Sequence, residues 1–377
     1  MKIAVNCWIL RNKQIDGIGN FTIETLRPLI QAHPEIEFQI LCDKKFTEGY
    51  FDFPNVTLHR IFPALRHPLL YLMYMEIAVG IFLRRERPDI FLGMDGSLCL
   101  NTSTPQLPVI YDLNFEHYPK DMPWRNRTYY RGMFPRFAKK ANRIATISEY
   151  SKEDIVKLYG IQPALIDNVS CGIKDKFFPL EKAAIETVRE KYSGGQPYFF
   201  FVGSMHPRKN ILRLLKAFNQ FKKESGSGFK LILAGHILWD DTDIKQVMDG
   251  LEYKSDVIFT GRVNDEDLNK LLGSAHALCF VPIFEGFGLP IVEAFQAGVP
   301  VICSNVTSMP EVAGDAALQV DPFSEIEIAA AMKKLAESPD LCKSLIEKGH
   351  QQKLQFTWKR TSELFYQSII KSLGGKA

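Results

Sequence analysis

The chain alternates short apolar runs with longer segments in which apolar residues recur at helical spacing. Apolar runs bounded by turn residues are typical of buried strands, and the longer segments are typical of amphipathic helices. Predicted strands cover residues 2–8, 38–42, 56–60, 90–93, 109–112, 143–147, 198–202, 229–234, 257–260, 277–281, 299–303 and 317–320. The main predicted helices cover residues 21–32, 68–86, 211–223, 265–272, 325–336 and 358–373, and Ser151, with Asp154 three residues on, is predicted to cap a further helix. Strands that alternate with helices favour an α/β fold with parallel sheets.

One segment near the middle of the chain interrupts this alternation. Residues 171–179 contain turn residues and little regular pattern, and strands and helices resume after them. A chain of 377 residues is also long for a single hydrophobic core. We therefore expect an N-terminal domain over residues 1–172, a C-terminal domain over residues 173–356 and a last helix in residues 357–377.

The second domain contains a strand, a glycine-rich turn and a helix that together carry two glutamates. The apolar run 277–281 is followed by Phe284, Glu285, Gly286, Phe287, Gly288, Leu289, Pro290, Ile291, Val292 and Glu293. The glycines permit a tight turn with uncovered backbone N–H groups, and the start of a helix attracts an anion such as phosphate. Carboxylates accept hydrogen bonds from pairs of hydroxyls, as they do on ribose. Unless both glutamates are solvated surface residues, this unit predicts a ligand with hydroxyls on both sides of its phosphates, as in a nucleotide-sugar.

A pair of cations follows the first strand of the same domain. Arg208 and Lys209 lie in the segment that begins at Gly203, between the predicted strand 198–202 and the helix 211–223. Adjacent cations at a strand end suit a diphosphate and would offset the charge that develops on a leaving group. The alternative is a pair of exposed surface cations.

The first domain offers two further groups of candidate residues. Asp112 ends the predicted strand 109–112 and His117 follows five residues on, and ligands of parallel sheets bind beyond the carboxyl ends of strands. Gly17 and Gly19 lie in the predicted turn 16–20 before a helix, where they either admit a phosphate or form only a tight turn.

The glutamate unit resembles the donor-site signature of the retaining glycosyltransferases of family 4. Arg208 and Lys209 match the Arg–Lys pair of that family, and one departure is Tyr111, where the family often has a histidine before the aspartate. The resemblance covers nearly the whole chain, including residues 17–19, 147–151, 172–173, 304–311 and 321–322. It implies the GT-B fold, in which two Rossmann-like parallel-sheet domains face each other across a cleft and the last helix crosses back to the first domain.

The resemblance also implies a role for each matched residue. Glu293 would bind the ribose, Arg208 and Lys209 the diphosphate, and Glu285, together with the backbone of residues 287–289, the hydroxyls of the sugar. No protein nucleophile is implied, because retention in the family is attributed to attack on the same face that the phosphate leaves. His117 is a candidate contact of the acceptor or of the donor sugar, or a structural histidine, and Asp112 is a further candidate catalytic residue.

The resemblance implies the transfer of mannose, glucose or a related hexose from a GDP- or UDP-linked donor to a glycan or lipid-linked acceptor in the synthesis of cell-surface polysaccharide. A nucleotide-sugar epimerase or hydrolase of the same fold, and a noncatalytic subunit that binds a nucleotide-sugar, remain as alternatives. A nicotinamide dehydrogenase is disfavoured because residues 17–22 lack the third glycine of the dinucleotide fingerprint.

We expect no metal and no cofactor other than the donor substrate. The notable Asp-x-Asp is Asp241 to Asp243, which we interpret as a surface loop, and Arg208 and Lys209 already supply positive charge. The net charge of +3 is too small to suggest nucleic acid as a partner. Seven scattered cysteines without a Cys-x-x-Cys and the absence of a signal peptide indicate a reducing compartment, so we expect a cytoplasmic protein, either free or peripheral on the inner face of the membrane.

Residues 120–143 are strongly basic. They hold eight arginines and lysines against the single Asp121, with Tyr129, Tyr130, Phe134 and Phe137 interleaved. This segment could form a surface that attracts an anionic lipid or a lipid-diphosphate acceptor. The alternative is a solvated amphipathic helix. The apolar helix predicted for residues 68–86 is interpreted as an ordinary core helix in preference to a membrane contact.

Overall fold

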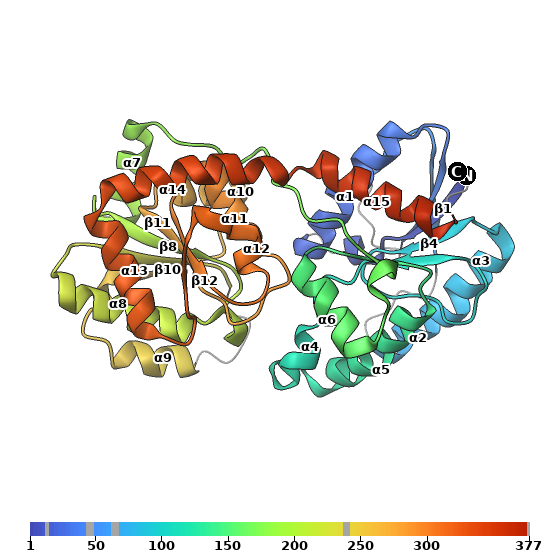
Figure 1. Cartoon of the computed structure of the whole chain (residues 1–377), viewed down its shortest axis with the longest axis horizontal. Helices are drawn as coiled ribbons and strands as arrows, with labels where there is room; N and C mark the ends of the chain where they lie inside the picture. The colour runs from blue at the N-terminus through green and yellow to red at the C-terminus, as the bar shows by residue number, and fades with distance from the viewer. Residues whose placement is uncertain (12–14, 43–48, 62–67, 237–241, 375–377) are drawn as a thin grey trace. The chain divides into compact units, whose positions relative to one another are not determined.

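The structure is a computed structural model that describes residues 1–11, 15–42, 49–61, 68–236 and 242–374. The chain divides into two compact units (Figure 1). Unit 1 is Met1–Gly172 together with Thr357–Ala377, and unit 2 is Ile173–Phe356. Each unit is built on its own parallel sheet, as the alternation of strands and helices predicts.

Unit 1 contains a five-stranded parallel sheet in the order β3-β2-β1-β4-β5. Its strands are β1 (Lys2–Asn6), β2 (Glu37–Cys42), β3 (Val56–Arg60), β4 (Ile90–Gly93) and β5 (Gln106–Pro108), and a separate parallel pair joins β6 (Ile144–Thr146) to β7 (Ile166–Asn168). The strand predicted over residues 109–112 is wrong. The sheet strand ends at Pro108 because the backbone then turns to β6, where Ile110 N donates to Ala145 O over 2.9 Å.

The helices of unit 1 are α1 (Gly17–Ala32), α2 (Pro68–Met73), α3 (Gly80–Glu86), α4 (Asn114–His117), α5 (Trp124–Lys140), α6 (Glu149–Tyr159) and α15 (Trp358–Ser372), with a π-helical turn η2 (Tyr74–Val79) between α2 and α3. Short 3₁₀ turns are η1 (Trp8–Arg11), η3 (Pro119–Asp121) and η4 (Pro163–Leu165). The last helix, α15, packs against α1 within this unit. Gly172 is required where α15 begins, because a Cβ there would lie 2.3 Å from Trp358 N.

Two helices of unit 1 begin earlier than predicted because a polar side chain caps them. Asp16 accepts a hydrogen bond from Gly19 N over 2.8 Å, so residues 17–20 form the first turn of α1 and not a preceding loop. Ser148 accepts from Ser151 N over 3.0 Å and begins α6, whereas the sequence suggests a cap at Ser151.

Unit 2 contains a six-stranded parallel sheet in the order β10-β9-β8-β11-β12-β13. The strands are β8 (Tyr198–Val202), β9 (Lys230–Ala234), β10 (Val257–Gly261), β11 (Ala277–Phe280), β12 (Val301–Ser304) and β13 (Leu318–Val320). Phenylalanines of β8 and β11 are fully buried and form its centre. The chain runs outward from β8 to β10 and then returns to β11 on the other side of β8. The strand order therefore reverses between β8 and β11.

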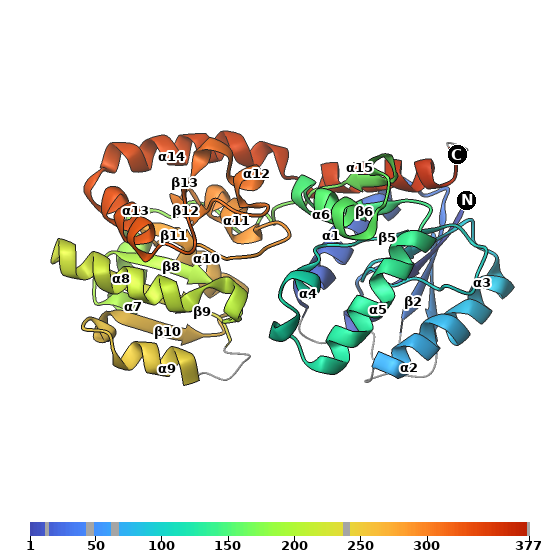
Figure 2. The same cartoon turned by 60° about the horizontal axis from the view of Figure 1, so that its bottom comes forward.

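The helices of unit 2 cover both faces of this sheet (Figures 1 and 2). They are α7 (Lys182–Ser193), α8 (Ile211–Ser225), α9 (Thr242–Asp249), α10 (Asp265–Gly273), α11 (Leu289–Ala297), α12 (Met309–Ala313), α13 (Glu325–Glu337) and α14 (Pro339–Gln352). The 3₁₀ turns are η5 (Pro207–Lys209), η6 (Lys254–Asp256), η7 (Gly314–Ala316) and η8 (Lys353–Gln355). Over the described residues, no helix is both long enough and apolar enough to cross a membrane.

Candidate functional site

The segments that carry the predicted donor residues leave neighbouring strands of unit 2 at their carboxyl ends. The first follows β8 and contains η5, and the second follows β11 and leads into α11. Their backbones meet directly, since Ile283 N donates to Arg208 O over 2.8 Å. The strand order reverses between β8 and β11, and such a switch point is where open parallel sheets bind ligands.

Glu285 lies between both predicted cations. Arg208 Nη1 and Lys209 Nζ each form an ion pair with Oε1 of this carboxylate, and Arg208 Nη1 also donates to Phe284 O over 3.1 Å. The three side chains are largely buried, with Lys209 only 11% exposed and its ammonium 5.0 Å from the centre of the Phe280 ring. Burial raises the pKa of Glu285, but Lys209 and Arg208 outweigh this effect and hold the pKa below its ordinary value. The carboxylate is therefore ionised at neutral pH and leaves the trio with one net positive charge.

The turn after Glu285 is fixed by packing and by one hydroxyl. Gly288 has φ 109°, and a Cβ at this position would lie 2.6 Å from Met309 Cε. The Ser308 hydroxyl lies 2.9 Å from Glu285 O and 3.0 Å from Phe287 O. Phe287 is buried against Phe356 with ring centres 5.6 Å apart. These contacts therefore fix the backbone conformation of the turn from Glu285 to the start of α11.

Helix α11 begins with an uncapped end and carries the second glutamate. Gly288 is its N-cap without a side chain to accept hydrogen bonds, and Leu289 and Pro290 form the first turn. Glu293 is half-buried in the next turn. Burial raises its pKa to about 7, with Lys176 and Lys174 acting against the rise and Asp265 adding to it. Unlike Glu285, Glu293 has no hydrogen bond or ion pair within the described part of the chain, and its charged neighbours differ from those of Glu285.

Gly203 lies at the end of β8 in a conformation that favours glycine, with φ 148°. Its N–H donates to Ala234 O over 3.0 Å, and a Cβ here would lie 3.9 Å from Lys209 Cε. The backbone of Gly203 is also tight against Gly235, where a Cβ would lie 1.8 Å from Gly203 O. These contacts place Gly203 beside the Lys209 side chain.

Asn210 is a positioning residue that the sequence reasoning missed. It is buried with φ 64°, and its amide donates to Val281 O over 3.0 Å and to Pro322 O over 2.7 Å. It therefore fastens the end of η5 to the segment after β11. Its position after the two cations could have suggested this role, because asparagine tolerates the left-handed region better than most residues.

Replacement of Asn210 by alanine is expected to lower the free energy of unfolding by about 2–4 kcal/mol, because two buried carbonyls lose their donor and alanine is strained at positive φ. Urea unfolding measures this change. Asn210→Gly is the matched control, because glycine removes the amide but accepts the backbone conformation. Equal stability of both variants and the parent would contradict the role assigned to the amide.

The candidates of unit 1 lie at the carboxyl side of its sheet. Asp112 Oδ1 accepts from Asn114 N over 3.0 Å at the start of α4. His117, at the end of α4, places Nε2 2.8 Å from an oxygen of Asp154, a buried carboxyl of α6. Burial raises the pKa of Asp154 and the His117 ring opposes the rise. This partner fixes the orientation of His117. Tyr111 donates from its hydroxyl to Met94 O over 2.8 Å.

Gly17 and Gly19 occupy the first turn of α1. The N–H of Gly19 is already taken by Asp16, and a Cβ at Gly19 would lie 2.7 Å from Ile15 Cγ2. This contact gives Gly19 a packing reason of its own. A phosphate-binding role for the two glycines stays a prediction.

The predicted Asp-x-Asp is only partly visible. Asp241 lies outside the described residues, and Thr242 and Asp243 begin α9. Over the described ranges, no three histidine, cysteine, aspartate or glutamate side chains form a group that could hold a metal ion.

Two family models match consecutive parts of the chain. "Glycosyltransferase Family 4" matches residues 15–177, and "Glycosyl transferases group 1" matches residues 185–352. The chain is 34% identical over 246 residues to O-antigen chain mannosyltransferase B of Escherichia coli, an alignment that covers 65% of this chain and 63% of that relative. It is 28% identical over 310 residues to O-antigen chain mannosyltransferase RfbU of Salmonella typhimurium, covering 80% of this chain and 82% of the relative.

The fold is shared with solved glycosyltransferase structures. Sucrose-phosphate synthase from Thermosynechococcus elongatus is similar with a TM-score of 0.77 at 17% identity, over 100% of both chains. At this identity the likeness concerns the fold alone, and it agrees with the two parallel-sheet units described above. The two family models match residues 15–177 and 185–352, and this chain belongs to the family 4 type of glycosyltransferases that they describe; the likeness to solved structures adds that it has the GT-B fold.

Proposed function

We propose that unit 2 binds a nucleoside diphosphate sugar and that the protein transfers its hexose, with retention of the anomeric configuration, to a glycan or lipid-linked acceptor. The observation that carries this proposal is the buried trio of Arg208, Lys209 and Glu285 at the switch point of the sheet. A structural ion pair would need one cation for the carboxylate. The second cation gives the trio a net positive charge that suits a diphosphate.

Donor binding exchanges the partners of the two cations. In the structure, Arg208 and Lys209 both face Glu285. A diphosphate, with its greater negative charge, would draw the cations to itself and free Glu285 to accept hydrogen bonds from hydroxyls of the sugar. The uncapped start of α11 adds N–H groups on the phosphate side, and Glu293 on the same helix accepts from the ribose.

The chemistry proposed is a substitution at the anomeric carbon. The bond from this carbon to the phosphate oxygen breaks, and its electron pair stays on the diphosphate. The acceptor oxygen bonds to the same carbon, and its proton passes to the departing phosphate oxygen. Arg208 and Lys209 stabilise the negative charge that develops on the diphosphate, so we propose a reaction that needs no divalent ion. The attacking hydroxyl belongs to the glycan or lipid-linked acceptor, which we propose is bound by unit 1.

Mannose is the first sugar to test. Both O-antigen relatives described above are named mannosyltransferases. Guanine and uracil are both candidates for the base of the nucleotide-sugar. Since the alignment with the first relative covers 63% of its length, the activity of the whole relative does not carry over by itself. An acceptor in the synthesis of cell-surface polysaccharide is consistent with both names.

A panel of nucleotide-sugars tests this function. We expect one GDP- or UDP-linked hexose to raise the melting temperature, because a ligand bound only by the native state stabilises it. We also expect transfer from this donor to a mannose-containing glycan in the presence of EDTA. Release of free sugar or of an epimer without an acceptor would favour a hydrolase or an epimerase. Binding without turnover on any acceptor would favour a noncatalytic subunit, and no shift with any donor would contradict the proposal.

A further inference from the structure

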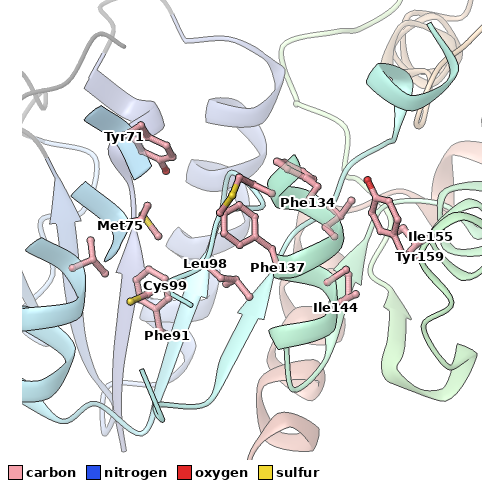
Figure 3. Packing of buried hydrophobic residues seen from close by; sticks show 14 of the residues in the cluster. Tyr71, Met75, Phe91, Leu98, Cys99, Phe134, Phe137, Ile144, Ile155 and Tyr159 are labelled. Atoms are coloured by element: carbon pink, nitrogen blue, oxygen red, sulfur yellow. The ribbon is translucent and has the colours of Figure 1, made fainter. Parts of the chain in front are cut away.

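The helical segment Leu70–Arg87 exposes a row of large apolar side chains. Leu70, Met73, Ile77 and Ile81 are 43%, 53%, 52% and 54% exposed, at spacings of three and four residues. The opposite side of the segment is buried in the core of unit 1, where Tyr71 and Met75 face Phe91 and Cys99 (Figure 3). The interpretation of residues 68–86 as an ordinary core helix is therefore correct for one side only. We call the four exposed residues the apolar row.

The exposed positions of this segment are either apolar or basic. Beyond the apolar row they are Arg84, Arg85 and Arg87. The two glutamates of the segment are drawn inward. Glu76 accepts hydrogen bonds from the backbone N–H groups of residues 100 and 101 over 2.8 and 3.0 Å, and the Glu86 side chain is 25% exposed beside Arg85. The surface is thus amphipathic without a negative charge at its exposed positions.

Helix α5 lies beside α2 in unit 1 (Figures 1 and 2). Its exposed residues also lack an acid and include the cations Arg125, Arg131, Arg136 and Lys139. Trp124, at its start, is 64% exposed with the Arg125 guanidinium 5.6 Å from the ring centre. Arg131 forms an ion pair with Glu116 over 2.8 Å, whereas the other three cations form no ion pair with a described acid.

The aromatic residues of α5 do not supply an apolar contact surface. Phe134 and Phe137 are buried and point into the core (Figure 3), and Tyr129 and Tyr130 pack against the same cluster. A basic helix alone holds a protein near an anionic surface only weakly, because exposed charges are screened by salt. The apolar side chains that would complete such a surface come from the neighbouring segment.

We propose that the apolar row and the exposed cations of α5 together form a docking surface for an anionic lipid bilayer. The apolar row and Trp124 would enter the headgroup region, and the arginines and Lys139 would face the lipid phosphates. Charge complementarity selects this partner, because an interface helix with one apolar face, cationic flanks and no exposed acid fits an anionic membrane surface. The inference does not depend on the donor site, which lies in unit 2.

Vesicle sedimentation tests this surface in the full-length protein. We expect the protein to sediment with vesicles of phosphatidylcholine containing phosphatidylglycerol, and binding to fall at least tenfold with Met73→Glu combined with Ile77→Glu. Arg136→Gln combined with Lys139→Gln is expected to weaken binding severalfold and to reduce its dependence on salt. Ile326→Glu is the matched control for an exposed apolar residue, because Ile326 is 68% exposed in α13 of unit 2.

Two readouts keep the docking surface separate from the donor site and from folding. The Met73→Glu, Ile77→Glu variant is expected to keep its melting temperature because both side chains are about half exposed, and to keep its affinity for the nucleoside diphosphate because the proposed donor residues belong to unit 2. Equal binding of all variants to anionic vesicles would overturn the proposal. Loss of a dimer in sedimentation velocity, without vesicle binding by the parent, would also overturn it and assign the apolar row to a second copy of the chain.

Discussion

Replacement of Glu285 by glutamine is expected to reduce sugar transfer at least a hundredfold, on the order of the loss seen when one charged or preorganised partner of a transition state is removed. Affinity for the nucleoside diphosphate without sugar is expected to stay the same or to rise. The reason is the arrangement of the trio. Glu285 occupies both Arg208 and Lys209 before the donor binds, so removal of its charge removes a competitor for these cations.

The loss of transfer without a loss of binding distinguishes the role of Glu285 from the roles of its cationic partners. Arg208→Ala is expected to lose both transfer and nucleoside diphosphate binding, because Arg208 would contact the phosphates in the complex. Glu266→Gln is the control, since Glu266 forms an exposed pair with Lys270 over 2.6 Å on α10. Calorimetric titration measures nucleoside diphosphate binding, and an assay with radiolabelled donor measures sugar transfer. Full transfer by Glu285→Gln would remove the assignment of Glu285 to the sugar.

Replacement of Glu293 by glutamine is expected to weaken donor binding and to stabilise the protein. The donor loses a charged acceptor for its ribose hydroxyls, which corresponds to roughly a tenfold to hundredfold loss of affinity. The stabilisation follows from the pKa of about 7 that burial gives this carboxyl, against about 4.3 in an unfolded chain. Above pH 7 the folded protein holds a half-buried charge without a hydrogen bond, and glutamine carries no charge.

The direction in which folding stability changes with pH follows from the raised pKa of Glu293. Between the unfolded and the folded pKa, the folded state binds more protons than the unfolded state, so stability falls as pH rises from about 4.3 to about 7. At pH 8 the variant should exceed the parent by about 1–3 kcal/mol, and at pH 4 the difference should vanish. Urea unfolding at both pH values measures this. A parent that is equal to the variant at pH 8 would contradict the account.

The same carboxyl should make donor binding depend on pH. Ribose hydroxyls donate to the ionised form, so the affinity of the parent should rise as pH increases through about 7, while that of Glu293→Gln should change less. Glu285 should contribute little to this dependence, because its pKa is lowered and it stays ionised over this range.

Much of unit 2 can be predicted from the sequence because its strands are short continuous apolar runs. The strand 198–202 agrees with β8 at both ends, and the turn from Glu285 to Leu289 leads into α11 as its glycines and Pro290 indicate. The ion pairs of Arg208 and Lys209 with one carboxylate could not be predicted, because 76 residues or more separate the partners and their distance depends on strand order. The hydrogen bonds from the Asn210 amide to Val281 and Pro322 could not be predicted for the same reason.

Helix starts and exposed faces in unit 1 are the less predictable part. Asp16 starts α1 ahead of the apolar pattern, because its capping outweighs the weak helix propensity of Gly17 and Gly19, and Ser148 caps α6 three residues before Ser151. The apolar segment 68–86 looks like core along its whole length, and only the packing shows that one side faces outward. Helices α7 and α14 lack a strong apolar pattern and escape prediction.

Hydrogen–deuterium exchange with and without the nucleoside diphosphate tests the central claim most directly. Binding is predicted to slow exchange of the backbone amides in residues 203–210 and 284–294 of unit 2. Slowed exchange in residues 17–20 without any change in residues 203–210 or 284–294 would contradict the placement of the donor in unit 2.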